Sequence, residues 1–277
     1  KVALSGLGGD ELFAGYRQYR HLQQSEHISL LWRRLPEWVR TSVRAAAYQV
    51  ARVTGRESIA EIPSWLELEF LARYLRTRTL FGEASKSALY GDGVIERQSG
   101  FAPSIDILRA YNLECELDSI VRVTRLELKS YMAHMLLRDT DAMSMAHSLE
   151  VRVPLIDHKL VEFATRIPAS LKLSKARFGM LGGRTKVILT DTLHDLLPPS
   201  IVKRRKQGFN MPLGHWMRGA LYPVVDEALS YRSVQRRGLL NPDSVKVLLR
   251  DFHSGRGPYM RIWALVVLEL WQREFLK

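Results

Sequence analysis

Residues 2–16, which read VALSGLGGDELFAGY, combine an apolar run, a glycine-rich turn and the start of a helix. The first three residues are typical of a strand, and three glycines follow within positions 6–9. Glycine lets backbone N–H groups approach a ligand closely, and a helix start favours negative charge. Asp10 and Glu11 open the helix. The segment therefore predicts a strand, a tight turn and a helix N-terminus beside which an anion could bind.

The two carboxylates at this helix start decide which anion could bind there. A free phosphate would be attracted by the backbone N–H groups but repelled by Asp10 and Glu11. The conflict disappears if Asp10 holds a Mg²⁺ ion that is itself bound to phosphate, because the cation reverses the local charge. The simpler alternative is a strand–helix turn in which Asp10 only caps the helix. The segment by itself leaves both interpretations open.

Three segments, in the right order, resemble signatures of the asparagine synthetase family. Residues 2–16 resemble S-G-x-G-x-D-E-x-F-x-G-Y, and residues 139–157 resemble D-x-x-S-M-A-x-S-L-E-x-R-x-P-x-x-D. Residues 183–189 resemble the helix start G-x-x-K-x-x-L. A weaker fourth match, residues 206–213, is similar to K-x-G-F-x-x-P-L. Together these matches extend the resemblance over most of the chain.

The resemblance implies the C-terminal part of an α/β ATP pyrophosphatase-type domain (adenine nucleotide alpha hydrolase-like). In such enzymes ATP and a carboxylate form an acyl-adenylate and pyrophosphate, and ammonia derived from glutamine then attacks the adenylate to give an amide. Aspartate is the expected carboxylate and asparagine the expected product. The implied cofactors are ATP and Mg²⁺. The implied partners are these small-molecule substrates and an N-terminal glutaminase region, and a homodimer is left open.

The resemblance also assigns roles to individual residues. Ser5 and Gly6 match positions that contact the AMP portion of the nucleotide. Asp10 matches a carboxylate that holds Mg²⁺ through pyrophosphate, and Lys186 matches a lysine that neutralises charge on the phosphates. Leu7 occupies the acceptor position, where typical members carry an acidic residue. Because leucine neither accepts a proton nor hydrogen-bonds, the acceptor is open, and a sugar amide, a peptide cyclisation or β-lactam formation are the alternatives.

Two elements of the family are not found in the 277 residues. The pyrophosphate-binding loop S-G-G-x-D-S is absent, and Cys115, the one cysteine, lies mid-chain without the context of a glutaminase nucleophile. The chain also starts at Lys1 directly on a strand-like run. We therefore interpret residues 1–277 as the C-terminal part of a synthetase domain and expect the chain alone to be inactive.

The composition excludes several classes of protein. Hydrophobic residues make up 46% of the chain and charged residues 25%, which is typical of a globular protein rather than a disordered one. The longest apolar run, residues 262–271, is about half the ~20 residues that a membrane span needs. Cys115 cannot form an internal disulfide, which fits a reducing compartment and a cytoplasmic location.

The net charge of +12 raises the question of an anionic partner. Residues 172–218 contain ten Lys or Arg and two Asp, a net of +8. Such a segment suits a nucleotide, a nucleic acid or plain solvation. A basic helical nucleic-acid-binding protein is therefore the alternative from another class, although no helix-turn-helix or RNA-binding signature is found. A catalytically dead scaffold is a third hypothesis.

Hydrophobic periodicity predicts a mainly α-helical chain, with one N-terminal strand followed by a helical bundle in one compact unit. Helices are expected at residues 10–24, at 30–53 with a break near Pro36, at 64–79, from 128 onward and at 259–275. Residues 91–104 are expected to form a loop. The side chains expected in the core include Met132, Met135, Met143, Met145, Trp263 and Trp271.

Other polar residues allow a structural and a functional interpretation. Glu150 and Arg152 could support catalysis, but a buried or half-buried ion pair that positions a loop is favoured. His147 and His158 lack a surrounding His, Cys or Asp cluster with ligand spacing, so no zinc site is predicted.

Overall fold

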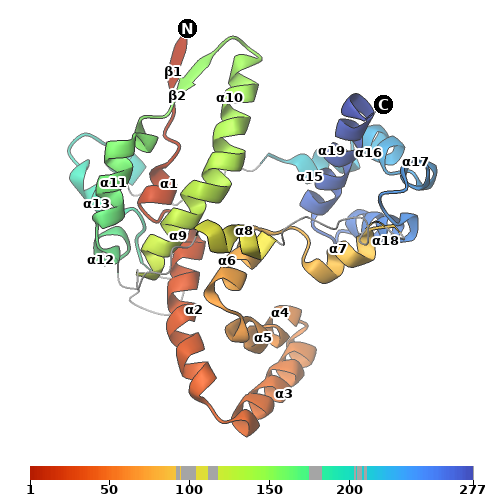
Figure 1. Ribbon diagram of the computed structural model, residues 1–277, viewed down its shortest axis with the longest axis horizontal. Helices are drawn as coiled ribbons and strands as arrows, with labels where there is room; N and C mark the ends of the chain where they lie inside the picture. The colour runs from red at the N-terminus through yellow and green to blue at the C-terminus, as the bar shows by residue number, and fades with distance from the viewer. Residues whose placement is uncertain are drawn as a thin grey trace. The chain divides into compact units, whose positions relative to one another are not determined.

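The computed structural model describes residues 1–91, 94, 104–111, 118–174, 183–202, 204, 208 and 211–276 (Figure 1). The chain divides into two compact units, where the sequence predicts one. Unit 1 comprises residues 1–77 and 103–204, and unit 2 comprises residues 78–102 and 205–277. Most of the loop predicted at 91–104 lies outside the described residues.

Both units are mainly helical, as the sequence predicts. The elements of unit 1 are β1 (Val2–Leu4), α1 (Gly9–Leu12), α2 (Arg17–Arg34), α3 (Glu37–Thr54), α4 (Glu57–Ala60), α5 (Ile62–Glu67), α6 (Phe70–Arg78), α8 (Ser104–Tyr111), α9 (Ser119–Glu127), a π-helix (Leu128–Leu136), α10 (Leu137–Met145), β2 (Glu150–Arg152), a 3₁₀ turn (Pro154–Ile156), α11 (His158–Arg166), α12 (Ala169–Lys172), α13 (Val187–Thr192) and α14 (Pro199–Val202). The elements of unit 2 are α7 (Glu83–Leu89), α15 (Leu213–Arg218), α16 (Tyr222–Ala228), α17 (Tyr231–Arg237), α18 (Pro242–His253) and α19 (Tyr259–Phe275).

The sheet of the described residues is one parallel pair, in which Leu4 of β1 lies opposite Arg152 of β2. Parallel strands need a crossover between them, and residues 5–149 supply it here. The expectation of a single strand is therefore wrong. The sequence does not reveal β2, because a three-residue strand of Glu, Val and Arg is too short to show an alternating pattern.

Two apolar clusters hold unit 1 together. The larger one lies among α2, α6 and α9, and its buried members are Ala14, Tyr19, Leu22, Phe70, Leu71, Tyr74, Leu108, Ile120, Val123, Leu126 and Leu173. The smaller one packs α1 against α11 and α13 through Leu12, Phe13, Ala164, Ile167, Ile188 and Leu189. The smaller cluster matters for function, because it holds the helix after β1 against two segments from much later in the chain.

Helix boundaries differ from the predicted ones at two places. The segment 10–24 is divided into α1 and α2, because Ala14 has a left-handed backbone (φ 54°) that no α-helix accommodates. The segment 64–79 is divided into α5 and α6 at Leu68, whose backbone is extended. The predicted break at Pro36 is confirmed, and so are the bounds of the last helix.

The helix expected from residue 128 begins as the π-helix Leu128–Leu136. Its i→i+5 hydrogen bonds give more residues per turn than an α-helix, so side chains drift away from the i, i+4 face. Met132 is buried, but Met135 is 49% exposed, and α10 has no buried residue at all. The expectation that the methionines fill the core is therefore wrong for Met135, Met143 and Met145.

The core of unit 2 gathers around α19. Its buried residues are Leu89, Leu213, Met217, Val225, Ala228, Leu229, Val234, Val245, Phe252, Ile262, Leu265 and Val266. Trp263 packs against this core, whereas Trp271 is 49% exposed. Eight residues at ~100° each leave these two side chains about 80° apart around the helix, so the expectation is wrong for Trp271.

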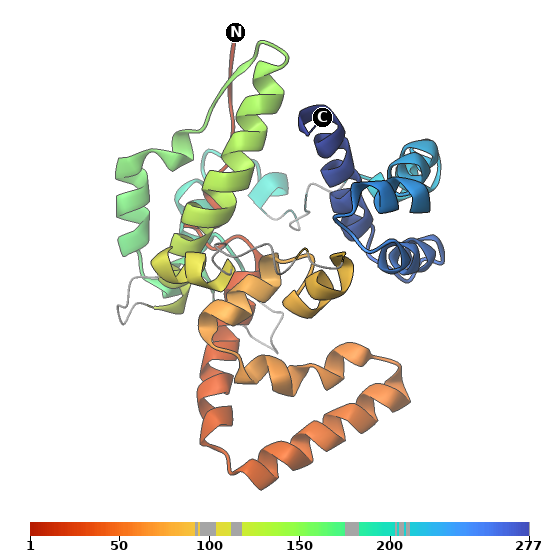
Figure 2. The ribbon, with the colours of Figure 1, turned by 45° about the vertical axis from the view of Figure 1, so that its right-hand side comes forward.

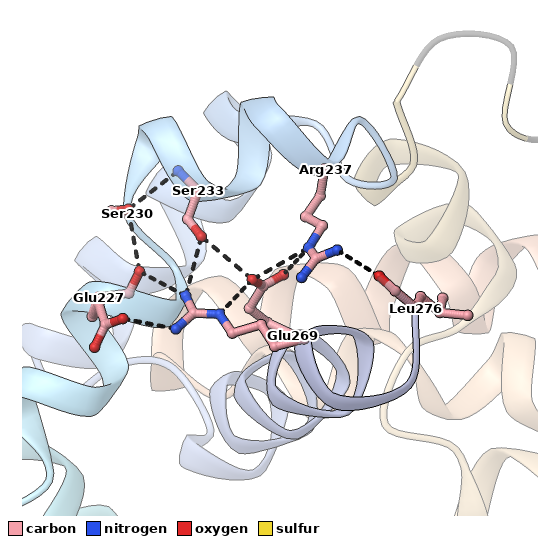
Figure 3. A network of polar contacts seen from close by, with 7 residues as sticks. Glu227, Ser230, Ser233, Arg237, Glu269 and Leu276 are labelled. Atoms are coloured by element: carbon pink, nitrogen blue, oxygen red, sulfur yellow. Dashed lines mark hydrogen bonds and ion pairs between the residues drawn. The ribbon is translucent and has the colours of Figure 1, made fainter.

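A buried carboxylate joins three helices of unit 2 (Figure 3). Glu269 of α19 is 6% exposed, and its Oε1 accepts a hydrogen bond of 2.8 Å from Arg273 Nε. Arg237 Nε of α17 lies 3.3 Å from Oε2, and Ser233 Oγ donates to Oε1 at 3.4 Å. Arg273 also reaches Glu227 of α16 at 2.8 Å. Two guanidinium groups therefore depend on one buried carboxylate for their charge balance.

Glu269→Gln is expected to lower the free energy of unfolding by about 1–3 kcal/mol, because the substitution removes the charge from hydrogen bonds that remain buried. Glu274→Gln is the matched control, since Glu274 lies on the same helix and is exposed. Urea unfolding followed by circular dichroism measures both. Equal stability of the two variants would show that the Glu269 network does not stabilise unit 2.

Candidate functional site

The turn after β1 brings the first and second motifs into contact. Ser5 N–H donates to the carbonyl of Arg152 at 2.8 Å, and Ser5 Oγ accepts a hydrogen bond of 3.3 Å from Leu7 N–H. Gly8 has a φ of 94°, and a Cβ at this position would lie 2.3 Å from Cδ1 of Ile156. Position 8 therefore requires glycine for its backbone conformation and for its contact with the second motif.

The same turn leaves space on its other side. No heavy atom lies within 4 Å of the place that a Cβ of Gly6 would take, and Gly6 is exposed. A Cβ at Gly9 would lie 3.9 Å from Lys186 Nζ. An open stretch of backbone thus lies next to the ammonium group contributed by the third motif.

Asp10 of the first motif and Lys186 of the third motif form an ion pair. Lys186 Nζ lies 3.1 Å from Asp10 Oδ1, and the two side chains are 29% and 27% exposed. The sequence assigns one of them to Mg²⁺ and the other to phosphate, and the structure brings both to one place. Their partial exposure leaves both groups accessible to a solute.

Gly15 explains why this pair can form so close to the backbone. A Cβ at Gly15 would lie 1.8 Å from Asp10 Oδ1 and 2.5 Å from Lys186 Cε. Gly15 N–H also donates to the carbonyl of Asp10 at 2.7 Å, which holds the chain in a tight reversal. Any larger residue at position 15 would occupy the volume of the ion pair itself.

The backbone of Lys186 is as unusual as its side chain. It adopts a left-handed conformation (φ 54°, ψ 33°) immediately before α13, and its N–H donates to the carbonyl of Phe13 at 3.2 Å. Ala14, which follows Phe13, has a φ of 54° as well. Each such residue costs about 1–2 kcal/mol. Strained residues that adjoin one another across a hydrogen bond are typical of a functional site.

Glu11 fixes α1 from its buried side. Its carboxylate accepts a hydrogen bond of 2.6 Å from Tyr16 Oη, and its carbonyl accepts from Tyr19 Oη at 2.5 Å and from Thr124 Oγ1 at 3.1 Å. Burial and the hydrogen bond with Glu11 raise the pKa of Tyr16 above its usual value, so its hydroxyl remains a donor. These contacts tie α1 to α2 and α9. Glu11 and Tyr16 belong to the first motif, but the sequence analysis gives them no contact.

Arg20 of α2 holds the segment that leads to Lys186. Its Nη1 donates to the carbonyl of Ser174 at 3.0 Å, and its Nη2 donates to the carbonyl of Arg184 at 3.3 Å. Ser174 and Arg184 are also joined directly, by Arg184 N–H to Ser174 Oγ at 2.7 Å. Gly183 has a φ of 107°, and its Cβ would lie 2.7 Å from Arg20 Nη2. Sequence reasoning missed Arg20, because its partners are backbone carbonyls and leave no side-chain pattern.

Glu150 and Arg152 form the predicted ion pair, with Arg152 Nε 2.8 Å from Glu150 Oε1. Their side chains are 54% and 63% exposed, so the expectation of a buried or half-buried pair is wrong. Alternate residues of a strand share one face, and this face of β2 is exposed. The carbonyl of Arg152, which binds Ser5, connects β2 to the site in place of the side chain.

The basic segment 172–218 does not form one cationic surface. Arg184 pairs with Asp191 within the segment, and Lys186 pairs with Asp10. Residues from 205 onward belong to unit 2, and of the fourth motif only Gly208 and residues 211–213 are described. The local excess of charge is therefore divided among separate structural roles.

Lys172 is the buried member of this segment. It is 0% exposed, and its Nζ has no hydrogen-bond partner in the structure. Burial lowers its pKa to about 8, and nearby Asp118 opposes the shift only in part. The sequence analysis counts Lys172 as a surface charge, and this interpretation is wrong.

Other metal and membrane features are limited to the described part of the chain. There, no three His, Cys, Asp or Glu side chains are grouped so that they could hold a metal ion. His147 and His158 are exposed, and Cys115 lies outside the described residues. None of the described helices combines the length and apolarity that crossing a membrane requires.

Comparison with known proteins agrees with this convergence of motifs. The family model described as Asparagine synthase matches residues 1–273. The chain belongs to the asparagine synthase family. The resemblance drawn from the motifs is confirmed, and the three motifs that meet at Asp10 and Lys186 are those of the family.

The relatives include both synthetases and a protein with another name. The chain is 28% identical to asparagine synthetase [glutamine-hydrolyzing] 1 of Bacillus subtilis, over 98% of this chain and 40% of the relative. It is 28% identical to a putative asparagine synthetase of Mycobacterium bovis, over 100% and 40% of the two chains. It is 27% identical to amidase chyE of Penicillium rubens, over 93% and 39%. The chain thus spans about two fifths of each relative's length, and no solved structure matches it.

Gly183→Ala is expected to destabilise the protein more than Gly55→Ala. Both glycines have a positive φ, but a Cβ at Gly183 meets Arg20 and Ser174, whereas a Cβ at Gly55 meets no atom within 4 Å. We expect a cost of about 1 kcal/mol at Gly55 for the backbone alone, and about 3 kcal/mol at Gly183. Urea unfolding measures both. Equal costs would mean that the contact with Arg20 does not require a glycine.

Lys172→Met is expected to stabilise the protein by about 3 kcal/mol at neutral pH, where the wild-type chain carries a buried charge. Below pH 8 the lysine is protonated in both the folded and the unfolded chain. Between pH 8 and 10.5 only the unfolded chain keeps the proton, so wild-type stability rises with pH over this window. Unfolding at several pH values should show the two proteins converging as pH rises. A constant difference would contradict the lowered pKa.

Proposed function

We propose that this chain forms part of the synthetase site of an ATP-dependent amidotransferase. The reaction adenylates a carboxylate, expected to be aspartate, and ammonia derived from glutamine converts the adenylate to an amide, with release of AMP and pyrophosphate. Family membership supports the class of reaction. Because the chain spans 40% of its relatives, we assign to it only the steps for which it supplies residues.

The single observation that carries this proposal is the Asp10–Lys186 pair above Gly15. Without a nucleotide, the two charges neutralise each other. With one, Asp10 would face a cation and Lys186 would turn its ammonium toward the phosphates, so the site would remain balanced in charge. Lys186 is suited to this exchange, because its backbone is fixed by Phe13 and Thr190 while its side chain stays partly exposed.

The residues present fit Mg²⁺ and ATP. Mg²⁺ prefers oxygen ligands and usually takes one or two carboxylates together with substrate phosphates, a role that Asp10 can fill. When bound, the metal would neutralise phosphate charge during adenylation. The exposed backbone at Ser5 and Gly6, with open space above Gly6, can accept the AMP portion. A parallel strand pair followed by a glycine turn supports the pyrophosphatase-type fold that we propose for the longer domain.

The acceptor carboxylate is the open part of the proposal. Leu7 is partly exposed beside the turn, and its backbone binds Ser5 Oγ, so the side chain supplies only apolar contact. An acceptor other than aspartate, as in formation of a sugar amide, a cyclic peptide or a β-lactam, would suit this position. Relatives named synthetase and amidase both match the chain, which keeps the alternative in view.

Lys186→Ala tests the assignment. In a longer protein that carries this chain together with an S-G-G-x-D-S loop, the variant should release pyrophosphate at least ~100-fold more slowly, the effect of removing one preorganised charge-stabilising group. Lys186→Arg should recover little, because a planar guanidinium presents its donors differently. Lys159→Ala, an exposed lysine on α11, is the matched control. The chain alone should release no pyrophosphate above background.

Thermal unfolding separates catalysis from folding in this experiment. Lys186→Ala should melt close to the wild type, because a partly exposed ion pair contributes about 0–1 kcal/mol. Wild-type rates in Lys186→Ala would refute the role of Lys186. A large loss of stability would make Lys186 a structural residue.

A further inference from the structure

Helix α3 turns its apolar side outward. It has 18 residues, and Ala51 is its one buried residue. In Figures 1 and 2, α2, α3 and the α4–α5 segment form three sides of a triangle at one end of unit 1. An amphipathic helix at a protein surface normally faces its apolar stripe toward the core. The side chains of α3 are arranged the other way round.

The charged side of α3 faces the rest of unit 1. Arg40 and Arg44 both pair with Glu37, and Arg44 also pairs with Glu67 at the end of α5. The hydrogen bond from Arg44 lowers the pKa of Glu67. Arg33 of α2 donates to the carbonyl of Leu68 at 3.1 Å. These contacts fix the rotation of α3 about its own axis.

The outward side of α3 carries no charge. At ~100° per residue, an arc of about 180° contains Trp38, Val39, Ser42, Val43, Ala46, Ala47, Gln49, Val50, Val53 and Thr54. We call Val39, Val43, Ala46, Val50 and Val53, which lie at its centre, the valine face. Exposed fractions reach 87% for Val53, 73% for Trp38 and 46% for Val50. A continuous apolar surface of this kind indicates a binding partner.

Arginines lie at both ends of the valine face. Residues 30–56 contain six Arg and one Glu, a net charge of +5. Arg34 lies just before α3, and Arg52 and Arg56 lie at its other end. These three side chains form no ion pair among the described residues, so their charges are available to an anionic partner.

We propose that α3 lies flat on an anionic membrane surface. The valine face and Trp38 enter the boundary between head groups and acyl chains, and the arginines at both ends bind lipid phosphates. A second copy of the chain is disfavoured, because it would bring a second net charge of +5 against the first. A nucleic acid would satisfy the arginines but leave the valines in water. The proposal is independent of the synthetase function.

This placement requires no membrane-spanning helix. Eighteen residues make a helix of about 27 Å, which lies along the surface. The sequence analysis excludes a membrane protein because no apolar run reaches the length of a span. A surface helix escapes that criterion, since its apolar residues are spread over one side.

Co-sedimentation of the full chain with lipid vesicles tests the proposal. The chain should bind vesicles of mixed phosphatidylcholine and phosphatidylglycerol, and it should bind pure phosphatidylcholine at least ~10-fold more weakly. Added salt should weaken binding to the anionic vesicles. Arg52→Gln should weaken it about fivefold, the effect of one charge near the surface.

Two matched variants separate insertion of the valine face from charge. Val50→Asp and Thr41→Asp change the net charge equally, but the positions lie about 180° apart on α3. Val50→Asp should bind anionic vesicles at least ~10-fold more weakly than Thr41→Asp, because only the first places a carboxylate in the membrane boundary. Circular dichroism confirms folding, and quenching of Trp38 by brominated lipid, with Trp38→Phe as control, reports insertion in the unaltered valine face.

Three results would overturn the proposal. They are equal binding to neutral and anionic vesicles, equal effects of the two aspartate variants, and absence of Trp38 quenching. A concentration-dependent dimer that Val50→Asp abolishes would assign the valine face to a second copy of the chain instead.

Discussion

The bare α-carbon of Gly15 is the constraint on which the site depends. Asp10 and Lys186 can meet only because no side chain stands between them and the backbone of the chain reversal. That reversal ends α1, sets the left-handed Ala14 and presents the carbonyl of Phe13 to Lys186. Packing of α1 against α11 and α13 then holds the two strained segments together. The local cost in backbone energy is offset by this surrounding core.

The site was predictable from sequence where identity follows from geometry within a short segment. The glycines at positions 8 and 15, Asp10 and Lys186 all occur in motifs whose spacing fixes a turn, and the structure brings these motifs together. Arg20 was not predictable, because it binds carbonyls more than 150 residues away, and carbonyls exist at every position. The roles of Asp10 and Lys186 in catalysis stay predictions.

The fold was predictable where periodicity is long and regular. The last helix and the break at Pro36 follow from pattern and from the chemistry of proline. The pattern failed at β2, which has three residues, and in the π-helix, whose period differs from 3.6. It also cannot tell which way an amphipathic helix faces. In α3 the inward side is set by arginine pairs with Glu37 and Glu67, not by apolar burial.

The π-helix has a consequence for the length of the chain. It lies between α9, which binds the carbonyl of Glu11, and β2, which pairs with β1. A π turn holds one residue more than the α-helical turn it replaces, so deleting one residue would convert it to α-helix and rotate all that follows by about 100°. β2 would then meet β1 out of register, and the carbonyl of Arg152 would move away from Ser5. The number of residues between Thr124 and Glu150 is therefore a structural parameter in its own right, as strict as the identity of any glycine in the turn.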